Sequence, residues 1–533
     1  MTTRFVVVLG SLLSGLGKGI VTSSLLKIFD LYDYKVLPVK FDGYLNYDCG
    51  TMNPYRHGEV FVLDDKSEVD MDFGTYERFL NRELTGKSSI TGGKLFSEII
   101  KREREGAYLG EDVQVIPHLT NLITDGLKKL GKDEGLDFLI IEVGGTAGDL
   151  ENGYFLEAMR ELSQKEKVIF IDVTLIPELK AVGEQKTKPT QIALRQLMQI
   201  GIKPDFLVCR GDNRLESTTK KKLALYANLP EDNIIDDSDS DCVYSLPESF
   251  MSQNMDRLLL KALGVSKRKM NGPKLKTWKT SVRALTSTKA KGVKIAIVGK
   301  YVKLKDAYVS VKEALQHSAA AVGLNPSIMW LEAEDIDSHV DELREADGII
   351  VPGGFGKRGI EGMIKAIKFA RENGKPYLGL CLGMQLMAVE FARNVCGLKD
   401  ANSTEFDDAT KNNVVDILPS QRKLNSKGGT MRLGTCEIQI IGRDTIVFAS
   451  YKSPRIHERH RHRYEINPEL RPVLEKAGLR VSAVSGDEQL VECIEWPGGF
   501  GIGSQFHPEF TSRPEKPAPL FTSFTRACAK NAG

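Results

Sequence analysis

The chain has 533 residues, of which 41% are hydrophobic and 27% charged, a composition typical of a globular protein with a sizeable core. Its 73 Lys and Arg residues nearly balance its 71 Asp and Glu residues, so no charge excess recruits nucleic acid or an anionic membrane. The eight cysteines are scattered without a CxxC pair, and no apolar run approaches the ~18 residues of a membrane span. We therefore expect a cytoplasmic protein with no signal peptide, no structural zinc, and neither nucleic acid nor a membrane as a partner.

Short β-branched runs alternate with helical stretches in both halves, without the polar alternation of half-exposed strands. This pattern predicts an α/β fold with parallel sheets and crossover helices, and ligands bound beyond the carboxyl ends of the strands. The expected strands lie at 5–9, 35–39, 137–142, 168–174, 205–209, 294–298, 348–351, 377–380 and 501–505.

A basic segment separates the two halves. Residues 267–291 hold nine Lys or Arg and no acid. Such segments can bind polyanions, but we favour a solvated linker. The predicted organisation is an N-terminal domain at 1–265, a linker at 266–291 and a C-terminal domain at 292–533.

A glycine-rich loop follows the first expected strand, Gly10-Ser11-Leu12-Leu13-Ser14-Gly15-Leu16-Gly17-Lys18-Gly19, and a helix is expected from about Ile20. Glycines let backbone N–H groups face phosphate oxygens, and the helix dipole and Lys18 add positive charge. An ordinary β–α turn is the simpler alternative, but a lysine there opposes the dipole. The loop departs from a standard Walker A motif, because Gly19 stands where Ser or Thr is usual.

Two carboxylates fit a Mg²⁺ site beside this loop. Glu142 ends an apolar strand, where an unpaired charge is costly. Asp72 lies in an acidic stretch, in which Asp70 and Asp72 could equally be solvated surface.

A second cluster, Lys186-Thr187-Lys188-Pro189-Thr190-Gln191, contains two cations and two hydroxyls ahead of a helix. It suggests a second polyphosphate site, and the alternative is an ordinary helix start with surface lysines.

In the C-terminal half, Gly379-Leu380-Cys381-Leu382-Gly383 follows an apolar strand and resembles a nucleophile elbow. Phe506-His507-Pro508-Glu509 offers His507 as the base and Glu509 as its orienting acid. The N–H groups of Leu382 and of Gly354, in the loop Pro352-Gly353-Gly354-Phe355-Gly356, would hold the oxyanion. The alternative is a cysteine packed in the core and a histidine packed in a loop.

These motifs together resemble the CTP synthase family over nearly the whole chain. The elbow and the FHPE sequence alone would indicate only a class I glutamine amidotransferase. The matching segments also include Gly50-Thr51-Met52, His57-Gly58-Glu59-Val60, Glu142–Thr146, Asn402–Glu405, Gly428–Gly434 and Glu458–Tyr464.

The resemblance implies a P-loop-type synthetase domain followed by a class I glutamine amidotransferase domain. The C-terminal domain would release ammonia from glutamine through a cysteinyl acyl-enzyme. The N-terminal domain would use ATP and Mg²⁺ to phosphorylate O4 of UTP, and ammonia would displace that phosphate. The resemblance also implies CTP as a feedback inhibitor, GTP as an allosteric activator, and a homotetramer that can stack into filaments.

Site residues follow by matching position to position. ATP would contact Gly15, Leu16, Gly17, Lys18, Gly19, Ile20, Asp72, Ser238, Asp239 and Ser240. UTP, and the shared part of CTP, would contact Ser14, Lys186, Thr187, Lys188, Pro189, Thr190, Gln191 and Lys222. Inhibitory CTP would contact Asp149, Leu150 and Glu151, and Mg²⁺ would be held by Asp72 and Glu142. Glutamine would contact Gly354, Leu382, Gly383, Met384, Gln385, Glu405 and Arg463. His57 is the candidate ammonia gate, and Arg358 with 429–432 the candidate GTP-responsive lid.

The chain departs from the family pattern in a few places. Gly15 stands where a serine is common, and Gly43 and Cys49 where prolines are common, so we expect a looser segment there. Ser238 replaces a commoner lysine beside the adenine. The competing hypothesis is a P-loop regulatory ATPase fused to an amidotransferase-like sensor, which would need only one nucleotide site.

Overall fold

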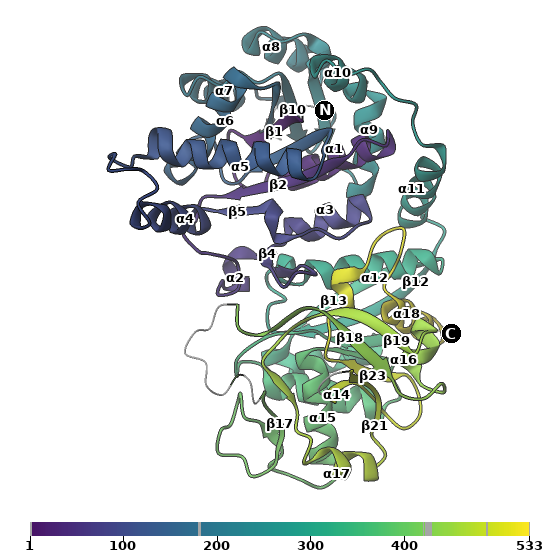
Figure 1. Ribbon diagram of the computed structural model, residues 1–533. Helices are drawn as coiled ribbons and strands as arrows, with labels where there is room; N and C mark the ends of the chain where they lie inside the picture. The colour runs from purple at the N-terminus through teal and green to yellow at the C-terminus, as the bar shows by residue number, and fades with distance from the viewer. Residues whose placement is uncertain (1–2, 180–182, 419–420, 422–428, 487–488, 532–533) are drawn as a thin grey trace. The chain divides into compact units, whose positions relative to one another are not determined.

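The computed structural model describes residues 3–179, 183–418, 421, 429–486 and 489–531 (Figure 1). The chain forms two compact units. The first comprises Met1–Asp48 and Thr75–Val282, and the second comprises Cys49–Gly74 and Arg283–Gly533. Among the helices of these described residues, none is long and apolar enough to cross a membrane.

The first unit is built on a seven-stranded parallel sheet with the order β11-β10-β7-β1-β6-β2-β5. Its strands are β1 (Arg4–Gly10), β2 (Val36–Asp42), β5 (Ser89–Thr91), β6 (Phe138–Val143), β7 (Val168–Leu175), β10 (Phe206–Gly211) and β11 (Ile234–Ser238). A small hairpin pairs β8 (Glu178–Leu179) with β9 (Glu184–Gln185). The helices are α1 (Lys18–Leu31), α3 (Asp72–Leu80, which starts in the second unit), α4 (Gly92–Arg104), α5 (Thr120–Asp133), α6 (Gly153–Lys165), α7 (Lys188–Gln199), α8 (Ser217–Ala227), α9 (Leu246–Ser252) and α10 (Met255–Ala262).

Helices cover both faces of this sheet, because its strands are apolar on both faces. Phe5, Val7 and Leu9 of β1 pack into one core with α4, α5 and α6. On the other face Phe29 of α1 stacks on Phe138 of β6, with ring centroids 4.3 Å apart. The glycine-rich loop is therefore held between a central strand and a buried helix.

The second unit is built on a nine-stranded mixed sheet with the order β13-β12-β14-β15-β23-β22-β21-β18-β19. Its strands are β12 (Lys291–Gly299), β13 (Leu324–Glu332), β14 (Gly348–Val351), β15 (Tyr377–Leu380), β18 (Arg432–Ile440), β19 (Arg455–His462), β21 (Arg480–Ser485), β22 (Val491–Glu495) and β23 (Gly501–Ser504). Shorter strands are β3 (Val60–Val62), β4 (Glu68–Asp70), β16 (Asn402–Ser403), β17 (Asn413–Ile417) and β20 (Tyr464–Ile466). The helices are α2 (Pro54–His57), α12 (Val309–Ala321), α13 (Val340–Glu345), α14 (Ile360–Glu372), α15 (Leu382–Asn394), α16 (Ile446–Tyr451), α17 (Arg471–Lys476) and α18 (Pro519–Asn531).

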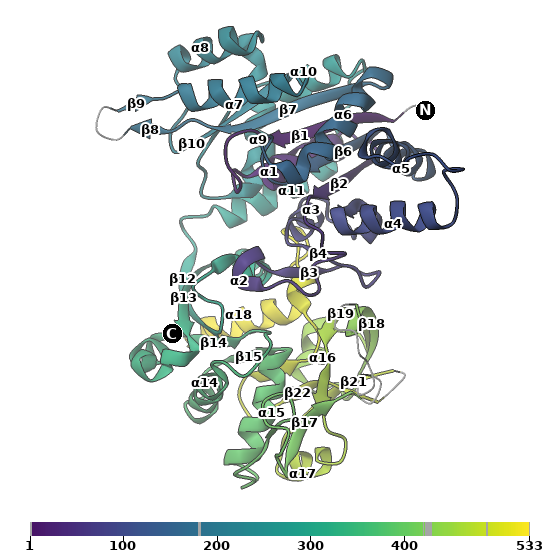
Figure 2. The same ribbon diagram turned by 90° about the vertical axis from the view of Figure 1, so that its left-hand side faces the viewer.

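This sheet also has a core on each face. Residues of α14 and α15 pack on one face, and residues of α12, α16 and α18 on the other, as Figure 2 shows for α15 and α18. The α/β fold class is confirmed, and every expected strand is present. The pure parallel arrangement is wrong for the second sheet, since β22, β21, β18 and β19 continue it in antiparallel fashion. These strands carry many Arg, His and Glu residues, so they lack the apolar runs that mark buried parallel strands.

The segment Cys49–Gly74 belongs to the second unit, although the sequence places it within the predicted N-terminal domain. The guanidinium of Arg459 on β19 is fully buried and donates to the carboxylate of Asp64 at 2.5 Å and to the carbonyl of Val62 at 3.1 Å. Arg461, two residues along β19, donates to Glu68 at 2.8 Å. Charged hydrogen bonds thus attach the β3–β4 hairpin to this unit.

Helix α11 (Gly272–Leu285) lies within the interval predicted as a linker. Its Trp278 is fully buried beside Phe79 and Tyr244, and Lys27 lies 4.2 Å from the Trp278 ring centroid. Basic residues of α11 such as Lys276 and Arg283 are exposed, while Trp278 is buried. Composition alone did not distinguish this packed helix from a solvated linker. The domain boundaries at 265 and 292 stay predictions.

Trp278→Ala should lower the free energy of unfolding by about 3–5 kcal/mol, because it removes a large buried ring. Urea denaturation measures this, with Lys276→Ala on the exposed face of α11 as the control, expected to change stability by less than about 0.5 kcal/mol. Equal effects of the two substitutions would show that α11 is not packed through Trp278.

Candidate active sites

Cys381 lies at a strained turn between β15 and α15. Its backbone has φ 52° and ψ −100°, an unusual conformation for a residue with a side chain. Both flanking glycines are required by close backbone approach. A Cβ at Gly379 would lie 2.7 Å from the carbonyl of Gly383, and a Cβ at Gly383 would lie 2.0 Å from the carbonyl oxygen of Val351. The nucleophile-elbow geometry that the sequence predicts is therefore present.

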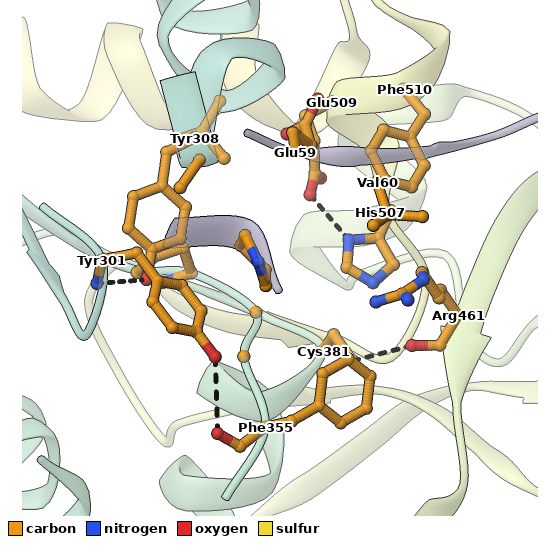
Figure 3. A pocket seen from close by; sticks show the side chains of 16 residues that line it. Glu59, Val60, Tyr301, Tyr308, Phe355, Cys381, Arg461, His507, Glu509 and Phe510 are labelled. Carbon is orange, nitrogen blue, oxygen red and sulfur yellow. Dashed lines mark hydrogen bonds and ion pairs between the residues drawn. The ribbon is translucent and has the colours of Figure 1, made fainter. Parts of the chain in front are cut away.

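His507 and Glu509 lie together beside Cys381 (Figure 3). Nδ1 of His507 is 2.7 Å from Oε1 of Glu509, and both side chains are buried. Burial by itself lowers the pKa of His507, but the negative charges of Glu509 and Cys381 outweigh it and raise that pKa to about 10. Nε2 of His507, the ring nitrogen not engaged by Glu509, meets no hydrogen-bond partner at standard geometry within the described residues.

The loop Pro352-Gly353-Gly354-Phe355-Gly356 lines the same pocket as Cys381 and His507. A Cβ at Gly353 would lie 3.0 Å from Cε1 of His507, so a larger residue would crowd the imidazole. Leu382 is the first residue of α15, where an N–H has no partner in a preceding turn. An ideal Cβ at Gly354 would lie 3.5 Å from the Leu382 side chain. The role of the Gly354 and Leu382 N–H groups as oxyanion donors stays a prediction.

Of the predicted glutamine contacts, Gly354 lines this pocket, and three others are held by hydrogen bonds within the second unit. Glu405 accepts from the N–H of Gly356 at 2.7 Å, and burial raises the pKa of Glu405. Gln385 donates to the carbonyl of Tyr464 at 2.8 Å. Arg463 donates to Gln421 at 2.8 Å and to Thr430 at 2.9 Å. Gly383 and Met384 lie in the first turn of α15.

Lys300 is a buried residue of this region that the sequence analysis did not single out. Its Nζ donates to the carbonyls of Phe355, at 3.1 Å, and of Gly356. Burial lowers the pKa of Lys300 to about 8, against the opposing charge of Glu405. A lysine directly after the strand-ending Gly299 was the available signal.

The pocket also includes Glu59 and Val60 at the start of β3 (Figure 3). Pro54, the first residue of α2 in the second unit, lines it as well. His57, the candidate ammonia gate, is the last residue of α2 in the same segment.

Arg358, a candidate for the GTP-responsive lid, donates to Glu334 at 3.0 Å and to the carbonyl of Lys300. Arg432, from the other lid segment, is paired with Glu492 at 2.6 Å and Glu465 at 3.1 Å. Gly428 lies outside the described residues.

The first unit carries the phosphate loop. Gly15 and Gly17 have φ of 74° and 89°, values that favour glycine, and Gly17 caps α1. Lys18 is buried and folds back over the loop, so a Cβ at Gly10 would lie 3.0 Å from its Nζ. That Nζ donates to the carbonyl of Gly145 at 2.5 Å. Gly19 and Ile20 continue the first turn of α1.

One pocket brings together the loop and the predicted adenine side. It is lined by Gly15, Leu16, Gly17, Ile20, Arg210, Asp237, Ser240, Val243 and Leu246. Arg210 and Asp237 were missed by the sequence analysis, because they meet only when β10 and β11 pair. Arg210 also pairs with Asp239, and Ser238 donates to Asp236 at 3.3 Å.

Asp172, on the strand beside β1, was also missed. It is fully buried and accepts from the hydroxyl of Ser11 in the loop at 2.8 Å. Burial raises the pKa of Asp172 to about 7, against the effects of Ser11 and Lys18.

The predicted UTP contacts lie at the start of α7 and on α8. Thr187 caps α7, and Pro189 follows Lys188 in its first turn. Lys186 pairs with Glu184 at 2.6 Å, and Lys222 contributes to lowering the pKa of Glu184. Gln191 donates to Thr187 at 3.1 Å, whereas the hydroxyl of Thr190 is turned to the carbonyl of Leu175. Ser14 is exposed in the phosphate loop.

The remaining predicted carboxylates differ in their surroundings. Glu142 is buried at the end of β6 and accepts from the hydroxyl of Tyr76. Asp72 begins α3. Asp149 accepts from both the N–H and the hydroxyl of Thr146, whereas Leu150 and Glu151 are exposed. Within the described residues no three His, Cys, Asp or Glu side chains gather as a metal site.

Two departures from the family pattern are tightly packed rather than loose. A Cβ at Gly43 would lie 2.4 Å from the side chain of Asn152. The N–H of Cys49 donates to the carbonyl of Glu68 at 3.2 Å, a bond that proline cannot make.

Known proteins match both units in sequence. The family described as CTP synthase N-terminus matches residues 4–265, and glutamine amidotransferase class-I matches residues 303–527. CTP synthase of Pyrococcus furiosus is 48% identical, with 98% of each chain covered. The chain belongs to the CTP synthase family. CTP synthase of Methanocaldococcus jannaschii is 46% identical, again over 98% of each chain. The structure titled Trypanosoma brucei CTPS glutaminase domain with bound acivicin is 41% identical and covers 45% of this chain and 94% of that one, with a TM-score of 0.42.

The His507–Glu509 pair gives a pH-dependent contribution to stability. The folded pKa of about 10 exceeds the ordinary value of 6.5, so this contribution is full below about pH 6.5 and is lost as pH rises through about 10. Glu509→Gln should remove that contribution, because burial then lowers the pKa of His507 and the negative charge of Glu509 no longer opposes this effect. The stability difference between wild type and variant should shrink from pH 6 to pH 10, measured by chemical denaturation. Glu469→Gln, at an exposed carboxylate, is the control, and a difference independent of pH would contradict the pairing.

Proposed function

We propose that this chain catalyses the ATP-dependent amination of UTP to CTP with ammonia released from glutamine. It is a ligase that forms a C–N bond in pyrimidine nucleotide biosynthesis. The observation that carries this conclusion is the match to CTP synthases over 98% of the chain, which includes both the Cys381 elbow and the Lys18 loop. A regulatory ATPase with an amidotransferase-like sensor is not favoured, since relatives matched over 98% of their length carry the CTP synthase name.

In the glutaminase half, Cys381 is the nucleophile. Its thiolate attacks the carboxamide carbon of glutamine, and the oxyanion is held by the N–H groups of Gly354 and Leu382. His507 gives its proton to the leaving ammonia as the C–N bond breaks, and Glu509 holds the ring through Nδ1. Water then attacks the thioester, with His507 as the base, and glutamate leaves. Glu405, Gln385 and Arg463 hold the amino-acid end of glutamine.

In the synthetase half, the loop from Gly15 to Ile20 binds ATP phosphates, and Lys18 carries positive charge to the transferred phosphoryl group. A carbonyl oxygen leaves poorly, so O4 of UTP is phosphorylated first, and ammonia then displaces phosphate. Mg²⁺, held by Asp72 and Glu142, would neutralise charge on the phosphates. The cluster at Lys186–Gln191 with Lys222 and Ser14 binds the UTP triphosphate, and Ser238–Ser240 line the adenine.

The proposal extends to regulation and assembly. CTP is a feedback inhibitor that shares the triphosphate contacts of UTP and turns its base to Asp149, Leu150 and Glu151. GTP is an activator acting through Arg358 and 429–432, His57 gates ammonia, and the chain assembles as a homotetramer in the cytoplasm.

The two half-reactions should be separable by substitution. Cys381→Ala should abolish glutamine-dependent CTP formation and spare ammonia-dependent formation, because only acyl transfer needs the thiolate. Lys18→Ala should abolish CTP formation from either nitrogen source and spare basal glutaminase activity, because its charge faces phosphates. Steady-state assays with each nitrogen source measure both.

Each variant is the matched control for the other in this pair. Loss of ammonia-dependent synthesis in folded Cys381→Ala would contradict the two-site proposal. Near wild-type synthesis from ammonia in Lys18→Ala would contradict the phosphate-loop assignment.

Feedback inhibition should depend on Glu151. A carboxylate accepts from the CTP amino group or a hydroxyl but offers a uracil carbonyl nothing. Glu151→Ala should raise the CTP concentration needed for inhibition about ten- to a hundredfold, with little change in the apparent UTP constant. Lys188→Ala should weaken the binding of both UTP and CTP, because the two nucleotides share the triphosphate contacts. Glu151 is the better probe than Asp149, whose carboxylate is engaged by Thr146.

The measurement is CTP formation across a grid of UTP and CTP concentrations, with exposed Asp232→Ala as the control. Parallel shifts of both constants in Glu151→Ala would show that the two nucleotides share one base pocket.

A further inference from the structure

A glutamine side chain lies against the Cys381 sulfur. Gln505 follows β23 and is fully buried, and its backbone N–H donates to the carbonyl of Glu492 at 2.8 Å. Its side-chain Nε2 lies 3.6 Å from Sγ of Cys381, within hydrogen-bond range for sulfur. Its Oε1 accepts from Nε2 of Gln385 at 3.2 Å.

The direction of this hydrogen-bond chain is determined at its far end. Nε2 of Gln385 also donates to the carbonyl of Tyr464 at 2.8 Å, and a backbone carbonyl can only accept. Gln385 therefore donates an N–H to Gln505, and the atom of Gln505 that accepts it must be the side-chain oxygen Oε1. The remaining end of the Gln505 amide, its NH₂ group, is thereby directed to the sulfur. If the Gln505 amide were turned the other way, its NH₂ group would face the NH₂ group of Gln385, and neither could accept a hydrogen bond.

Two groups contact the Cys381 sulfur, one an acceptor and one a donor. The carbonyl of Arg461 on β19 lies 3.8 Å from Sγ (Figure 3) and can accept only from the neutral thiol. The Gln505 N–H can donate to either state, but more strongly to the thiolate. The N-terminus of α15 begins directly after Cys381, and His507 lines the same pocket. Gln505 is thus a neutral donor that offsets the Arg461 carbonyl.

We propose that Gln505 is a further catalytic residue of the glutaminase site, whose amide N–H stabilises and aims the Cys381 thiolate through an orientation imposed by Gln385. This inference rests on the proposed role of Cys381 as nucleophile. In the attack, the sulfur lone pair forms the S–C bond, the C–N bond breaks, and ammonia leaves with a proton from His507. The Gln505 N–H holds the sulfur before this step and again when water displaces it from the acyl group.

Gln505→Glu is the sharpest variant, because it keeps the shape and the oxygen that accepts from Gln385 while replacing the N–H with a carboxyl oxygen. A charge-assisted hydrogen bond is lost, so glutaminase kcat/KM should fall about ten- to a hundredfold, mainly in kcat. The rate of Cys381 alkylation by iodoacetamide, followed by mass spectrometry across pH, should move its midpoint to higher pH by about one unit or more. Gln505→Asn, which withdraws the amide by one methylene, should move it in the same direction by less.

The matched control is Gln439→Glu, at an exposed glutamine on β18, which should leave both the alkylation midpoint and kcat/KM unchanged. Circular dichroism and thermal unfolding establish whether each variant is folded. If Gln505→Glu does not fold, Gln505→Asn is used for the test instead. Unchanged alkylation midpoints in folded Gln505 variants would overturn the inference, even if stability fell, because a space-filling role does not move the pH dependence.

Failure of the proposed function has a different signature. If alkylation of wild-type Cys381 left glutaminase activity intact, Cys381 would not be the nucleophile at all. If it abolished glutaminase activity while the Gln505 variants kept the wild-type midpoint, only the role of Gln505 would be lost.

Discussion

The turn from a parallel strand into the next helix is the constraint on which both candidate sites depend. Between β15 and α15 the backbone approaches so closely that Gly379 and Gly383 leave no room for a Cβ. The intervening residue, Cys381, is forced into a strained conformation at a helix N-terminus. Between β1 and α1, glycines with positive φ form the loop over which Lys18 folds. The same strand-to-helix turn thus positions Cys381, the proposed nucleophile, in one unit and Lys18, the proposed phosphate-binding lysine, in the other.

Buried charge organises the antiparallel half of the second sheet. Arg432 is paired with Glu465 and Glu492, and the buried Arg459 is paired with Asp64, which is exposed. Buried ions cost desolvation energy that their partners only partly return, so such pairs specify an arrangement more than they stabilise it. Here the arrangement is the position of β19, whose Arg461 carbonyl faces Cys381 and whose arginines hold the Cys49–Gly74 segment. That segment supplies Glu59 and Val60 to the pocket of the nucleophile.

The pKa of His507 depends on these neighbours. Burial by itself lowers that pKa, but Glu509 at 2.7 Å and the adjacent sulfur outweigh burial and raise it to about 10. Amide groups complete the surroundings of the sulfur without adding charge, through Gln385 and Gln505. Lys300, by contrast, is a buried cation that holds the carbonyls of the PGGFG loop and lies near Glu405.

The sequence by itself determined the α/β class, the expected strands, the elbow and the phosphate loop. Each depends on local chemistry: apolar runs, glycine spacing, and a lysine or cysteine at a strand end. Only the tertiary structure decided the antiparallel half of the second sheet, the packing of Trp278 in a basic helix, and the place of Cys49–Gly74 in the second unit. It also decided that Arg210 meets Asp237, that Asp172 supports the loop, and that Gln505 faces Cys381. These contacts join residues distant in sequence or on neighbouring strands, and their side chains carry no periodic pattern. Pairing of strands and burial of charge, which are properties of the folded chain, select among the arrangements that such residues could adopt.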